Sequence, residues 1–265
     1  MRAPGAASAS PSFTDLHRTE APLLLPNAWD HASATAMAGL GFSAIGTTSL
    51  AVAAASGLPD GASATRDETL RLALILGSQP FLLTVDAENG FSDDPDEVAE
   101  LARRLAAVGA VGINLEDGLS PTDRHMAKIA AVKSAVPGLF VNARTDTYWL
   151  GEHSTTETLA RLDAYQQAGA DGVFVPGLTD AGEIAALVER LDVPLNILYS
   201  PAGPTVPHLT DLGVSRISFG SFLYRRALGA ALEAVGEIRA GRHPGGPTPT
   251  YGEVESLGID TARHV

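Results

Sequence analysis

Cysteine is absent from this chain of 265 residues. Its absence excludes disulfide bonds, thiolate metal sites and a cysteine that acts as nucleophile or acid. Basic residues are scarce, because 18 Lys and Arg stand against 31 Asp and Glu and leave a formal net charge of −13. Phosphate backbones and anionic lipid repel so acidic a chain, so we expect no nucleic-acid partner and no membrane partner.

A long stretch between Asp30 and Asp60 contains no charged residue. A membrane-spanning helix needs about 20 predominantly apolar residues, whereas this stretch is interrupted by glycine, serine and threonine. We interpret it as a short buried helix, a buried strand and a close-packed loop. The first residues, MRAPGAASASPS, lack the apolar segment of a signal peptide. We therefore predict a disordered leader over residues 1–12 and a cytoplasmic protein.

Short apolar runs alternate along the chain with segments of helical period. These runs are nearly continuous, as expected for parallel strands covered on both faces. We predict eight strands: Leu23–Pro26, Ser43–Thr47, Phe81–Asp86, Val111–Leu115, Leu139–Ala143, Gly172–Val175, Leu195–Leu198 and Ser215–Phe219. Helix starts are predicted at Asp94-Pro95, Ser154 and Asp180, and Thr65 with Glu68 resembles a capping box.

This order of elements predicts an α/β fold, a single-domain (β/α)8 TIM-type barrel over residues 13–240. Residues 241–265 form a Pro/Gly-rich tail that we expect to pack on a neighbouring subunit. A doubly wound open sheet is the alternative, but the first strand is followed by PNAWDHAS rather than by a G-x-G-x-x-G loop.

Acidic residues follow two consecutive predicted strands, and in such a barrel the active site lies at these strand ends. Asp86 and Glu88 follow the third strand and Glu116 follows the fourth. Carboxylates this close repel one another, so we predict that they bind a divalent cation. Ligation by oxygen alone favours Mg²⁺ or Mn²⁺. The alternative is that each carboxylate caps a helix or pairs with a basic residue.

Other strand ends carry groups suited to binding an acid. Arg144, in VNARTD, suits bidentate capture of a substrate carboxylate and could equally pair with Asp146 or Glu116. Thr48 and Ser49 lie in a turn that can hold an oxyanion, and Asn196 lies at the seventh strand. His125 is expected in the loop after the fourth strand, where it could reach a substrate, and the other histidines are expected at the surface. Gly118 and Pro121 make this loop a candidate lid.

Six segments, in this order, resemble the isocitrate lyase/phosphoenolpyruvate mutase superfamily: PNAWD, GTTSLAVAAASGLPDG, VDAENGFS, NLEDG, NARTD and GSFLYRRA. The resemblance covers nearly the whole chain. It implies a (β/α)8 barrel, a homo-oligomer (a dimer or a tetramer) whose eighth helix is often exchanged between subunits, and a small carboxylic-acid substrate. The members make or break a C–C or P–C bond beside a 2-oxo or 2-hydroxy acid, and Mg²⁺ holds an enolate-like pyruvyl unit.

Residue roles follow from the same resemblance. Asp86 would be the direct metal ligand, with Glu88 and Glu116 holding the ion mostly through water. Asp60, in the GLPDG loop, would be the acid near metal and substrate. Thr48, Ser49 and Leu50 would form the turn that holds the substrate carboxylate and oxyanion. Arg144 would bind the same carboxylate.

One difference from the family reduces the number of reactions that the sequence supports. The lyases carry a Lys-Lys/Arg-Cys-Gly-His loop after the fourth strand, whose cysteine protonates the enolate, whereas residues 118–125 here read GLSPTDRH. The lysine and asparagine of the mutase loop are missing as well. This argues against isocitrate or methylisocitrate cleavage and against phosphoryl migration.

The sequence therefore predicts a Mg²⁺-dependent carbon–carbon lyase that acts through a pyruvate-type enolate. The proton donor is left open among water, Tyr199, His125 and Asp60. Alternatives are decarboxylation of an oxaloacetate-type acid, hydrolysis of a phosphonopyruvate-type acid, and a non-catalytic barrel that binds metal and carboxylate. A phosphosugar enzyme would need phosphate-binding loops after strands seven and eight, but Pro201, Pro204 and Pro207 remove N–H donors there.

Overall fold

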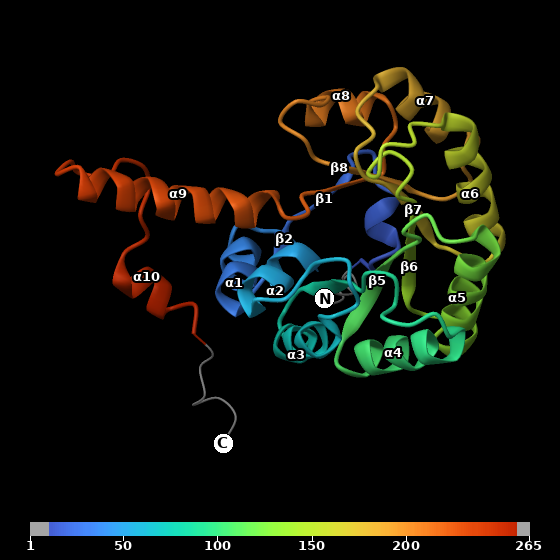
Figure 1. Cartoon of the computed structure of the whole chain (residues 1–265), viewed down its shortest axis with the longest axis horizontal. Helices are drawn as coiled ribbons and strands as arrows, with labels where there is room; N and C mark the ends of the chain where they lie inside the picture. The colour runs from blue at the N-terminus through green and yellow to red at the C-terminus, as the bar shows by residue number, and fades with distance from the viewer. Residues whose placement is uncertain (1–10, 259–265) are drawn as a thin grey trace, which may run out of the picture.

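The computed structural model describes residues 11–258 and consists of a parallel barrel surrounded by helices (Figure 1). Neighbouring strands follow the order β1-β9-β8-β7-β6-β5-β4-β3-β2. The strands are β1 (Leu23–Leu25), β2 (Asn27–Ala28), β3 (Ala44–Thr47), β4 (Leu82–Asp86), β5 (Ala110–Glu116), β6 (Phe140–Arg144), β7 (Gly172–Val175), β8 (Leu195–Leu198) and β9 (Arg216–Ser218). The predicted TIM-type barrel is thereby confirmed, with boundaries within a few residues of those expected.

The first predicted strand is in fact two, because Pro26 lacks the N–H that would continue the ladder. β1 pairs with β9 and β2 pairs with β3, so this divided strand joins the two ends of the sheet. Asn27 reinforces the junction: its Nδ2 donates to the Thr47 carbonyl at 2.7 Å, and its Oδ1 accepts from the backbone N–H groups of Phe219 and Gly220. The seam of the barrel is thus held by one buried amide.

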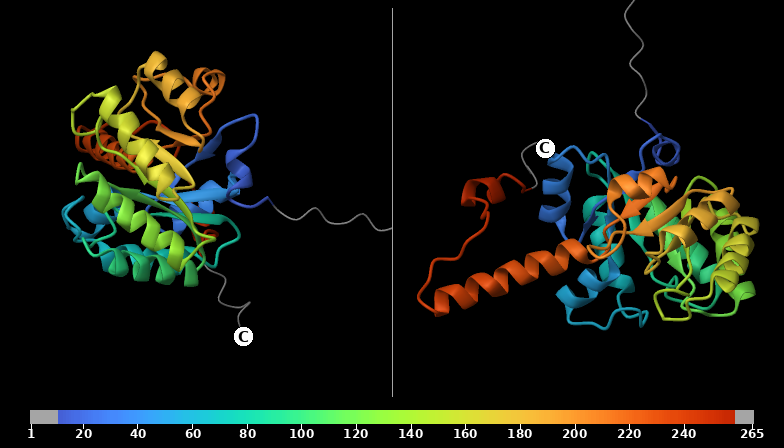
Figure 2. Two further views of the ribbon diagram at one scale, coloured as in Figure 1. Left: turned by 90° about the vertical axis from the view of Figure 1, so that its right-hand side faces the viewer. Right: turned by 90° about the horizontal axis from the view of Figure 1, so that it is seen from above.

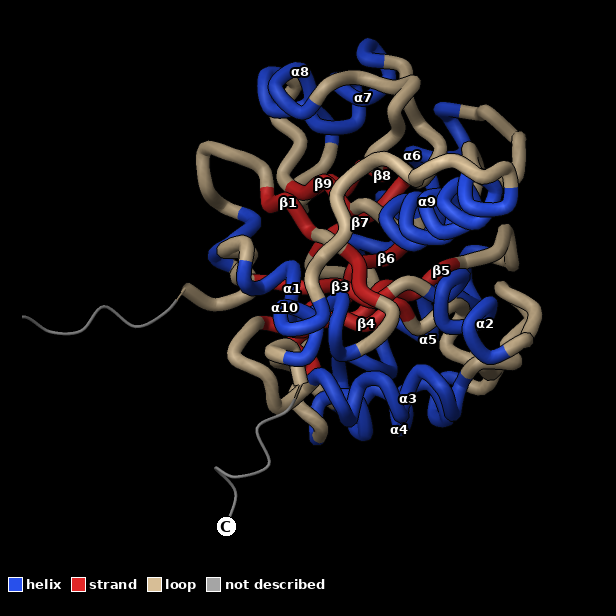
Figure 3. The backbone as a smooth tube through the Cα atoms, turned by 90° about the vertical axis from the view of Figure 1, so that its left-hand side faces the viewer, coloured by secondary structure: helices blue, strands red, loops and turns tan. Residues whose placement is uncertain are grey.

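The helices lie outside the strands (Figure 3). They are α1 (His31–Gly39), α2 (Ser49–Ser56), α3 (Arg66–Leu76), α4 (Pro95–Ala107), α5 (Thr122–Ala135), α6 (Thr155–Gln167), α7 (Ala181–Arg190), α8 (Val206–Asp211), α9 (Phe222–Arg239) and α10 (Tyr251–Glu255). The N-caps predicted at Asp94, Ser154 and Asp180 are confirmed by side-chain acceptance of a backbone N–H. The capping box at Thr65 is wrong, because the Thr65 hydroxyl donates to Glu88 instead of capping α3.

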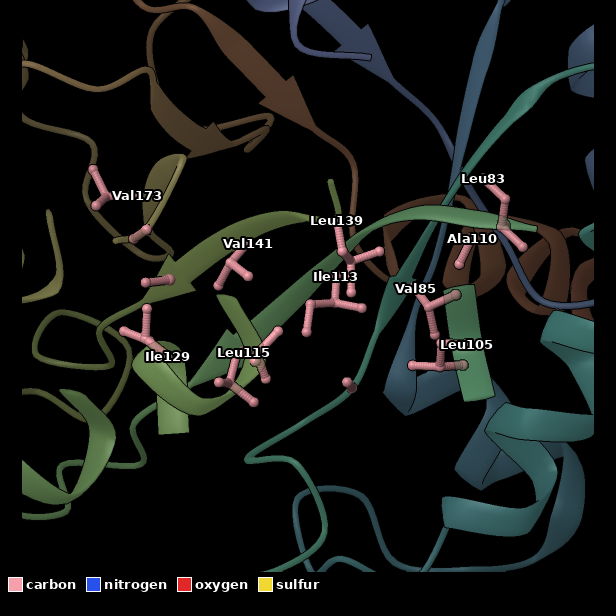
Figure 4. Close-up of a cluster of buried hydrophobic side chains, with 14 of the residues drawn as sticks. Leu83, Val85, Leu105, Ala110, Ile113, Leu115, Ile129, Leu139, Val141 and Val173 are labelled. Atoms are coloured by element: carbon pink, nitrogen blue, oxygen red, sulfur yellow. The ribbon is translucent and has the colours of Figure 1, made fainter. Parts of the chain in front are cut away.

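The strands have apolar outer faces, and the middle of the barrel interior is polar at β5, β6 and β9. Outward side chains such as Leu83, Ile113 and Val141 pack with Leu105 and Ile129 of the surrounding helices (Figure 4). Inside the barrel, polar side chains meet instead: Asn142 Nδ2 and Arg216 Nη2 both donate to Asn114 Oδ1, at 2.9 and 3.1 Å. The main hydrophobic core therefore lies between the barrel and the helices. Inside the barrel, below the strand ends, polar side chains form hydrogen bonds with one another.

The lower end of the barrel is closed by the segment before β1. Phe13 is buried against Phe140, with ring centroids 5.3 Å apart, and His17 stacks on Phe140 at 4.4 Å. His17 lies in a short 3-10 helix (Asp15–His17), and its Nδ1 contacts the Phe13 carbonyl at 2.8 Å. Residues 13–17 therefore belong to the barrel core, whereas most of the predicted leader, residues 1–10, lies outside the described residues.

Two histidines are buried, contrary to the surface or loop positions expected for them. His17 is 4% exposed, and His125 is 1% exposed in α5, where its ring packs edge-on against Tyr165. Burial, with a contribution from the positive charge of Arg216, lowers the pKa of His17 to about 3. Burial likewise lowers the pKa of His125 to about 4, against the opposing effect of Asp117. Both rings are therefore neutral when the protein is folded at neutral pH.

We expect these two histidines to make the fold sensitive to acid. Between the ordinary histidine pKa of about 6.5 and these lowered values, the unfolded chain binds protons that the folded chain does not. The free energy of unfolding should thus rise with pH in this window. Each histidine should remove about 2 kcal/mol as the pH falls from 7 to 5. Denaturant unfolding across this range should show a shallower decline for His17→Gln and for His125→Gln than for the native protein. The exposed residue His208 provides the control, and equal slopes in all proteins would contradict the assignment.

α9 projects away from the barrel (Figure 2). No residue of this 18-residue helix is buried, although one face carries Leu228, Leu232, Val235 and Ile238, each about half or more exposed. The chain then turns back, and His31 Nε2 lies 2.9 Å from the Leu257 carbonyl oxygen. Of the tail predicted over residues 241–265, residues 259–265 lie outside the described part. Across residues 11–258, no helix combines the length and hydrophobicity needed to cross a bilayer.

Candidate active site

A cavity of about 430 Å³ opens at the carboxyl ends of the strands. It is lined by side chains or backbone from nearly every strand end, which explains how residues far apart in the sequence meet there. The lining residues are Asn27, Thr48, Ser49, Leu50, Asp60, Gly61, Asp86, Asn114, Glu116, Gly118, Arg144, Asp146, Trp149, Leu150, Phe174, Pro176, Leu198, Ser218, Gly220 and Ser221. A second cavity of similar size lies beside Arg18 and Asp171 at the opposite end of the strands and contains none of the predicted site residues.

Arg144 occupies the centre of the site between two carboxylates. Its Nη1 lies 2.8 Å from Glu116 Oε2, and its Nε donates to Asp146 Oδ1 at 2.6 Å. The guanidinium carbon also lies 5.9 Å from the Trp149 ring centroid and 5.8 Å from that of Phe174, within cation–π range. Two ion pairs and two aromatic rings thus fix the guanidinium and leave its remaining edge for a ligand.

A buried network behind the cavity holds this arrangement. Asp117 accepts hydrogen bonds from Tyr165 Oη at 2.7 Å, from Arg161 Nη1 at 3.1 Å and from the Asp146 backbone N–H at 3.0 Å. The Asp146 carboxylate in turn accepts from the Gly118 backbone N–H. Burial alone would raise the pKa of Asp117, but these hydrogen bonds hold it below its ordinary value. Asp117 therefore stays ionised and ties the loop after β5 to the loop after β6, which carries Asp146.

The carboxyl group of Glu116 has an unusually high pKa. Burial raises its pKa to about 8; Arg144 acts in the opposite direction, while the negative charges of Asp86, Asp146 and Glu88 add to the rise. The like charges that raise the pKa show that Asp86 and Glu116 share one electrostatic environment, as the sequence predicted. Near neutral pH this site tends to take up a positive charge, either a proton or a cation.

Asp86 lies at the end of β4 with its carboxylate at the cavity. Its Oδ2 accepts the backbone N–H of Ser49 at 3.0 Å, and its own backbone N–H donates to Thr47 Oγ1. The N-terminus of α2 therefore faces the same cavity, since Thr48 is its N-cap and Thr48, Ser49 and Leu50 all line the wall. A helix N-terminus favours bound anions, in agreement with the oxyanion-binding turn predicted here.

Glu88 does not line the cavity, although its negative charge contributes to the raised pKa of Glu116. Its backbone adopts a positive φ of 46°, and its carboxylate, 1% exposed, accepts from the Ser63 backbone N–H at 3.1 Å and from the Thr65 hydroxyl. Glu88 thus anchors the loop that carries Asp60, which does line the cavity. Burial is the main cause that raises the pKa of Glu88.

Two further predicted site residues lie away from the cavity. Asn196 is in the barrel lumen, one layer below, where its Nδ2 donates to Ser218 Oγ at 3.2 Å, and Leu198 occupies the strand end instead. His125 is directed into the α5–α6 packing against Tyr165 rather than into the cavity. Asn196 points into the barrel but comes two residues before the end of β8, so it lies below the cavity. His125 belongs to helix α5 and not to the preceding loop.

Asn114 lines the cavity and was not selected from the sequence. Because Asn142 and Arg216 both donate to its Oδ1, its amide orientation is fixed and the NH₂ group is left on the other side. The spacing contains a usable signal, since Asn114 precedes Glu116 by two residues and alternate residues of a strand share a face. The apolar wall residues Trp149, Phe174 and Leu198 carry no comparable signal.

The lining residues fit a hard divalent cation, although they do not form a complete ligand shell. Four carboxylates, Asp60, Asp86, Glu116 and Asp146, face one guanidinium, so the pairing with Arg144 leaves an excess of negative charge. Within residues 11–258, no three acidic or histidine side chains lie close enough to bind one metal ion directly. The donor set therefore fits an ion that keeps several waters, as Mg²⁺ commonly does.

Comparison with known proteins shows which family the chain resembles. Residues 13–239 match the family model for phosphoenolpyruvate phosphomutase. The chain is 43% identical over 254 residues to an uncharacterized protein of Mycobacterium tuberculosis, covering 94% of this chain and 96% of that protein. It is 30% identical over 235 residues to an oxaloacetate decarboxylase of Pseudomonas entomophila, covering 81% and 79% of the two chains. The solved structure of 2,3-dimethylmalate lyase, described as a member of the PEP mutase/isocitrate lyase superfamily, superimposes with a TM-score of 0.82 at 25% identity, covering 95% of this chain and 96% of that one.

Barrel, strand-end carboxylates and family match point to the same conclusion. The match extends over the whole barrel and α9, so it includes every lining residue of the cavity. The superfamily contains lyases and mutases that act on small carboxylic acids. This chain belongs to the phosphoenolpyruvate mutase/isocitrate lyase superfamily.

Proposed function

We propose that the protein is a Mg²⁺-dependent carbon–carbon lyase that cleaves a small 2-oxo or 2-hydroxy acid and releases a pyruvate-type enolate. One observation supports this proposal most directly: four carboxylates and one guanidinium share a cavity with the N-terminus of α2. The carboxylates suit a cation, and the guanidinium and helix terminus suit the carboxylate of an acid. Bound Mg²⁺, or Mn²⁺ in its place, would supply Lewis-acid stabilisation of the developing negative charge.

The cavity residues have distinct parts in this reaction. Asp86 is the direct ligand in the proposal, Glu116 contributes through water, and Glu88 acts from outside the cavity by holding the Asp60 loop. Arg144 and the turn Thr48–Leu50 bind the substrate carboxylate, and the Asn114 NH₂ group donates to an oxygen near the reacting carbon.

For a 4-hydroxy-2-oxo acid the electron movements are those of a reverse aldol reaction. Asp60 accepts the proton of the C4 hydroxyl, the C3–C4 bond breaks to release a carbonyl compound, and the bonding electrons form the enolate across C2 and C3. Asp60 or a water then returns a proton to C3 and yields pyruvate. General acid–base groups of this kind typically contribute about 10²–10⁴-fold to the rate. Since His125 faces away from the cavity, it has no part in this scheme.

The test is pyruvate release from a panel of C4–C7 2-oxo and 2-hydroxy acids, with Mg²⁺ and after its removal by EDTA. We expect turnover of at least one acid, lost on chelation and restored by added Mg²⁺ or Mn²⁺. A thermal-shift titration with oxalate, an enolate mimic, measures binding independently of turnover. Oxalate binding with Mg²⁺ but no turnover of any acid would favour a non-catalytic barrel. Absence of both would contradict the proposed site.

Decarboxylation of an oxaloacetate-type acid is the second candidate. The relative in Pseudomonas entomophila is named for that reaction, and the chain contains no cysteine to act as a dedicated acid. Loss of CO₂ makes less demand on such an acid because no base is generated on the leaving group. Hydrolysis of a phosphonopyruvate-type acid is a further variant of the same enolate chemistry. The panel extended with phosphonopyruvate, with detection of CO₂ and phosphate, separates the three.

We further propose that α9 mediates assembly into a dimer or a tetramer. Leu228, Leu232, Val235 and Ile238 recur on one face of α9, and the helix is largely exposed beyond its first turn. Burial of each such side chain typically contributes about 1.5–3 kcal/mol. Light scattering after gel filtration should show an oligomer for the native protein and smaller species for Leu232→Glu. Leu74→Glu, at a similarly exposed leucine of α3, is the control. A native monomer would contradict the role of α9.

A further inference from the structure

The cavity has a charged floor and an apolar wall. The apolar wall is formed by Leu150, Pro176 and Leu198. It continues to Trp149 and Phe174, whose rings also contact the Arg144 guanidinium, and Trp149 and Leu150 are 56% and 57% exposed. An exposed tryptophan and leucine side by side at a cavity entrance form apolar surface that a ligand would remove from water.

Positive charge in the cavity is limited to one group. Among the lining residues of the described chain, Arg144 is the one basic side chain, and its Nη1 and Nε already face Glu116 and Asp146. Neither of these contacts uses Nη2. The Nη2 group of Arg144 is therefore available to donate to one substrate carboxylate.

Arg216, which contacts the lining residue Asn114, is 1% exposed in the barrel lumen, donates its Nη2 to Asn114 Oδ1 and does not line the cavity. Three other basic residues are paired outside the cavity. Arg124 pairs with Asp93 at 3.0 Å, Lys128 Nζ donates to the Asn89 carbonyl at 2.9 Å, and Arg161 is held by Asp117 and Glu157. None of the three lines the cavity. A second substrate carboxylate beyond Arg144 would therefore meet Leu150, Pro176 and Leu198 rather than a second basic side chain, next to the protein carboxylates that line the cavity. Like charges placed together in this way typically cost several kcal/mol.

We infer that the substrate has a single carboxylate and an uncharged, apolar far end: an alkyl-substituted 2-oxo or 2-hydroxy monocarboxylic acid rather than a di- or tricarboxylic acid. This inference rests on the proposed function, because it takes the 2-oxo acid head to be bound by Arg144 and the cation. The inference also distinguishes between the candidate substrates of that function. It argues against oxaloacetate-type acids, because they carry a second carboxylate that the apolar wall does not accommodate.

Isothermal titration of the full-length protein with Mg²⁺ tests the inference on a matched pair of non-cleavable acids. 5-Methyl-2-oxohexanoate has the 2-oxo acid head and length of 2-oxoglutarate, with two methyl groups in place of the two distal carboxylate oxygens. We expect it to bind at least tenfold more tightly than 2-oxoglutarate. For turnover, 4-hydroxy-4-methyl-2-oxopentanoate should release pyruvate with a higher kcat/KM than 4-hydroxy-4-methyl-2-oxoglutarate, from which it differs by methyl for carboxylate.

A cation placed at the entrance should change the preference. Leu150→Arg is expected to tighten binding of 2-oxoglutarate about tenfold and to weaken binding of 5-methyl-2-oxohexanoate. Leu74→Arg, at an exposed leucine of α3 far from the lining residues, should leave both affinities unchanged. Equal or tighter binding of 2-oxoglutarate by the native protein would overturn the inference and leave the proposed function intact. Failure of both acids to bind would overturn the proposed function, and the inference with it, because the two share the same head.

Discussion

Arg144→Ala is expected to lower kcat/KM for the substrate by about 10³-fold, with most of the loss in binding and positioning of the acid. Truncation of one partner of a buried, hydrogen-bonded charge pair typically costs about 3–5 kcal/mol, and here it also removes the one basic group that lines the cavity. Glu116 and Asp146 would then lie side by side without their shared counter-charge. The measurements are steady-state pyruvate release and the affinity for oxalate.

Two further variants separate the substrate-binding role from a purely structural one. Arg144→Lys retains the charge but cannot contact both carboxylates and a ligand at once, so we expect part of the binding energy to return. Arg124→Ala removes a half-exposed arginine that pairs with Asp93 outside the cavity and should leave kcat/KM unchanged. Native kcat/KM in Arg144→Ala would show that another group holds the carboxylate.

Asp86→Asn is expected to abolish Mg²⁺-dependent activity while leaving the metal-free protein about as stable as the native one. The amide can still accept the Ser49 N–H, so the local hydrogen bond is retained, but the negative charge that the cation requires is lost. The same change removes one of the charges that raise the pKa of Glu116. The loss of repulsion with Glu116 is opposed by the loss of attraction to the buried Arg216, so the free energy of unfolding in EDTA should change by no more than about 1 kcal/mol.

The measurements for Asp86→Asn are a Mg²⁺ titration followed by thermal shift and denaturant unfolding in EDTA. Asp93→Asn, at an exposed aspartate that does not line the cavity, is the matched control. A variant that keeps the full Mg²⁺-dependent thermal shift would exclude Asp86 as the direct ligand. A marked loss of stability in EDTA would show that its charge serves the fold rather than the site.

Loop positions near the site show how far a local pattern can be followed. Glu88 follows Asp86 by two residues, and a strand continued to Glu88 would have placed both side chains on one face. β4 ends at Asp86, however, and the left-handed backbone at Glu88 directs its carboxylate to Ser63 and Thr65. The two-residue alternation of side chains holds only within a strand, so it does not predict side-chain directions in the loop that follows.

The sequence by itself determined the barrel, because each apolar run is long enough for one buried strand and each intervening segment for one helix. It also determined the positions of Asp86, Glu116 and Arg144, because parallel strands bring their carboxyl ends to one rim. Only the tertiary structure decided how these groups meet: that Arg144 is shared by Glu116 and Asp146, that Asn114 has its oxygen fixed from below, and that aromatic and aliphatic side chains close the far wall. The physical reason is that a strand fixes the face on which a side chain lies, whereas its hydrogen-bond partners come from strands and loops that are remote in the chain.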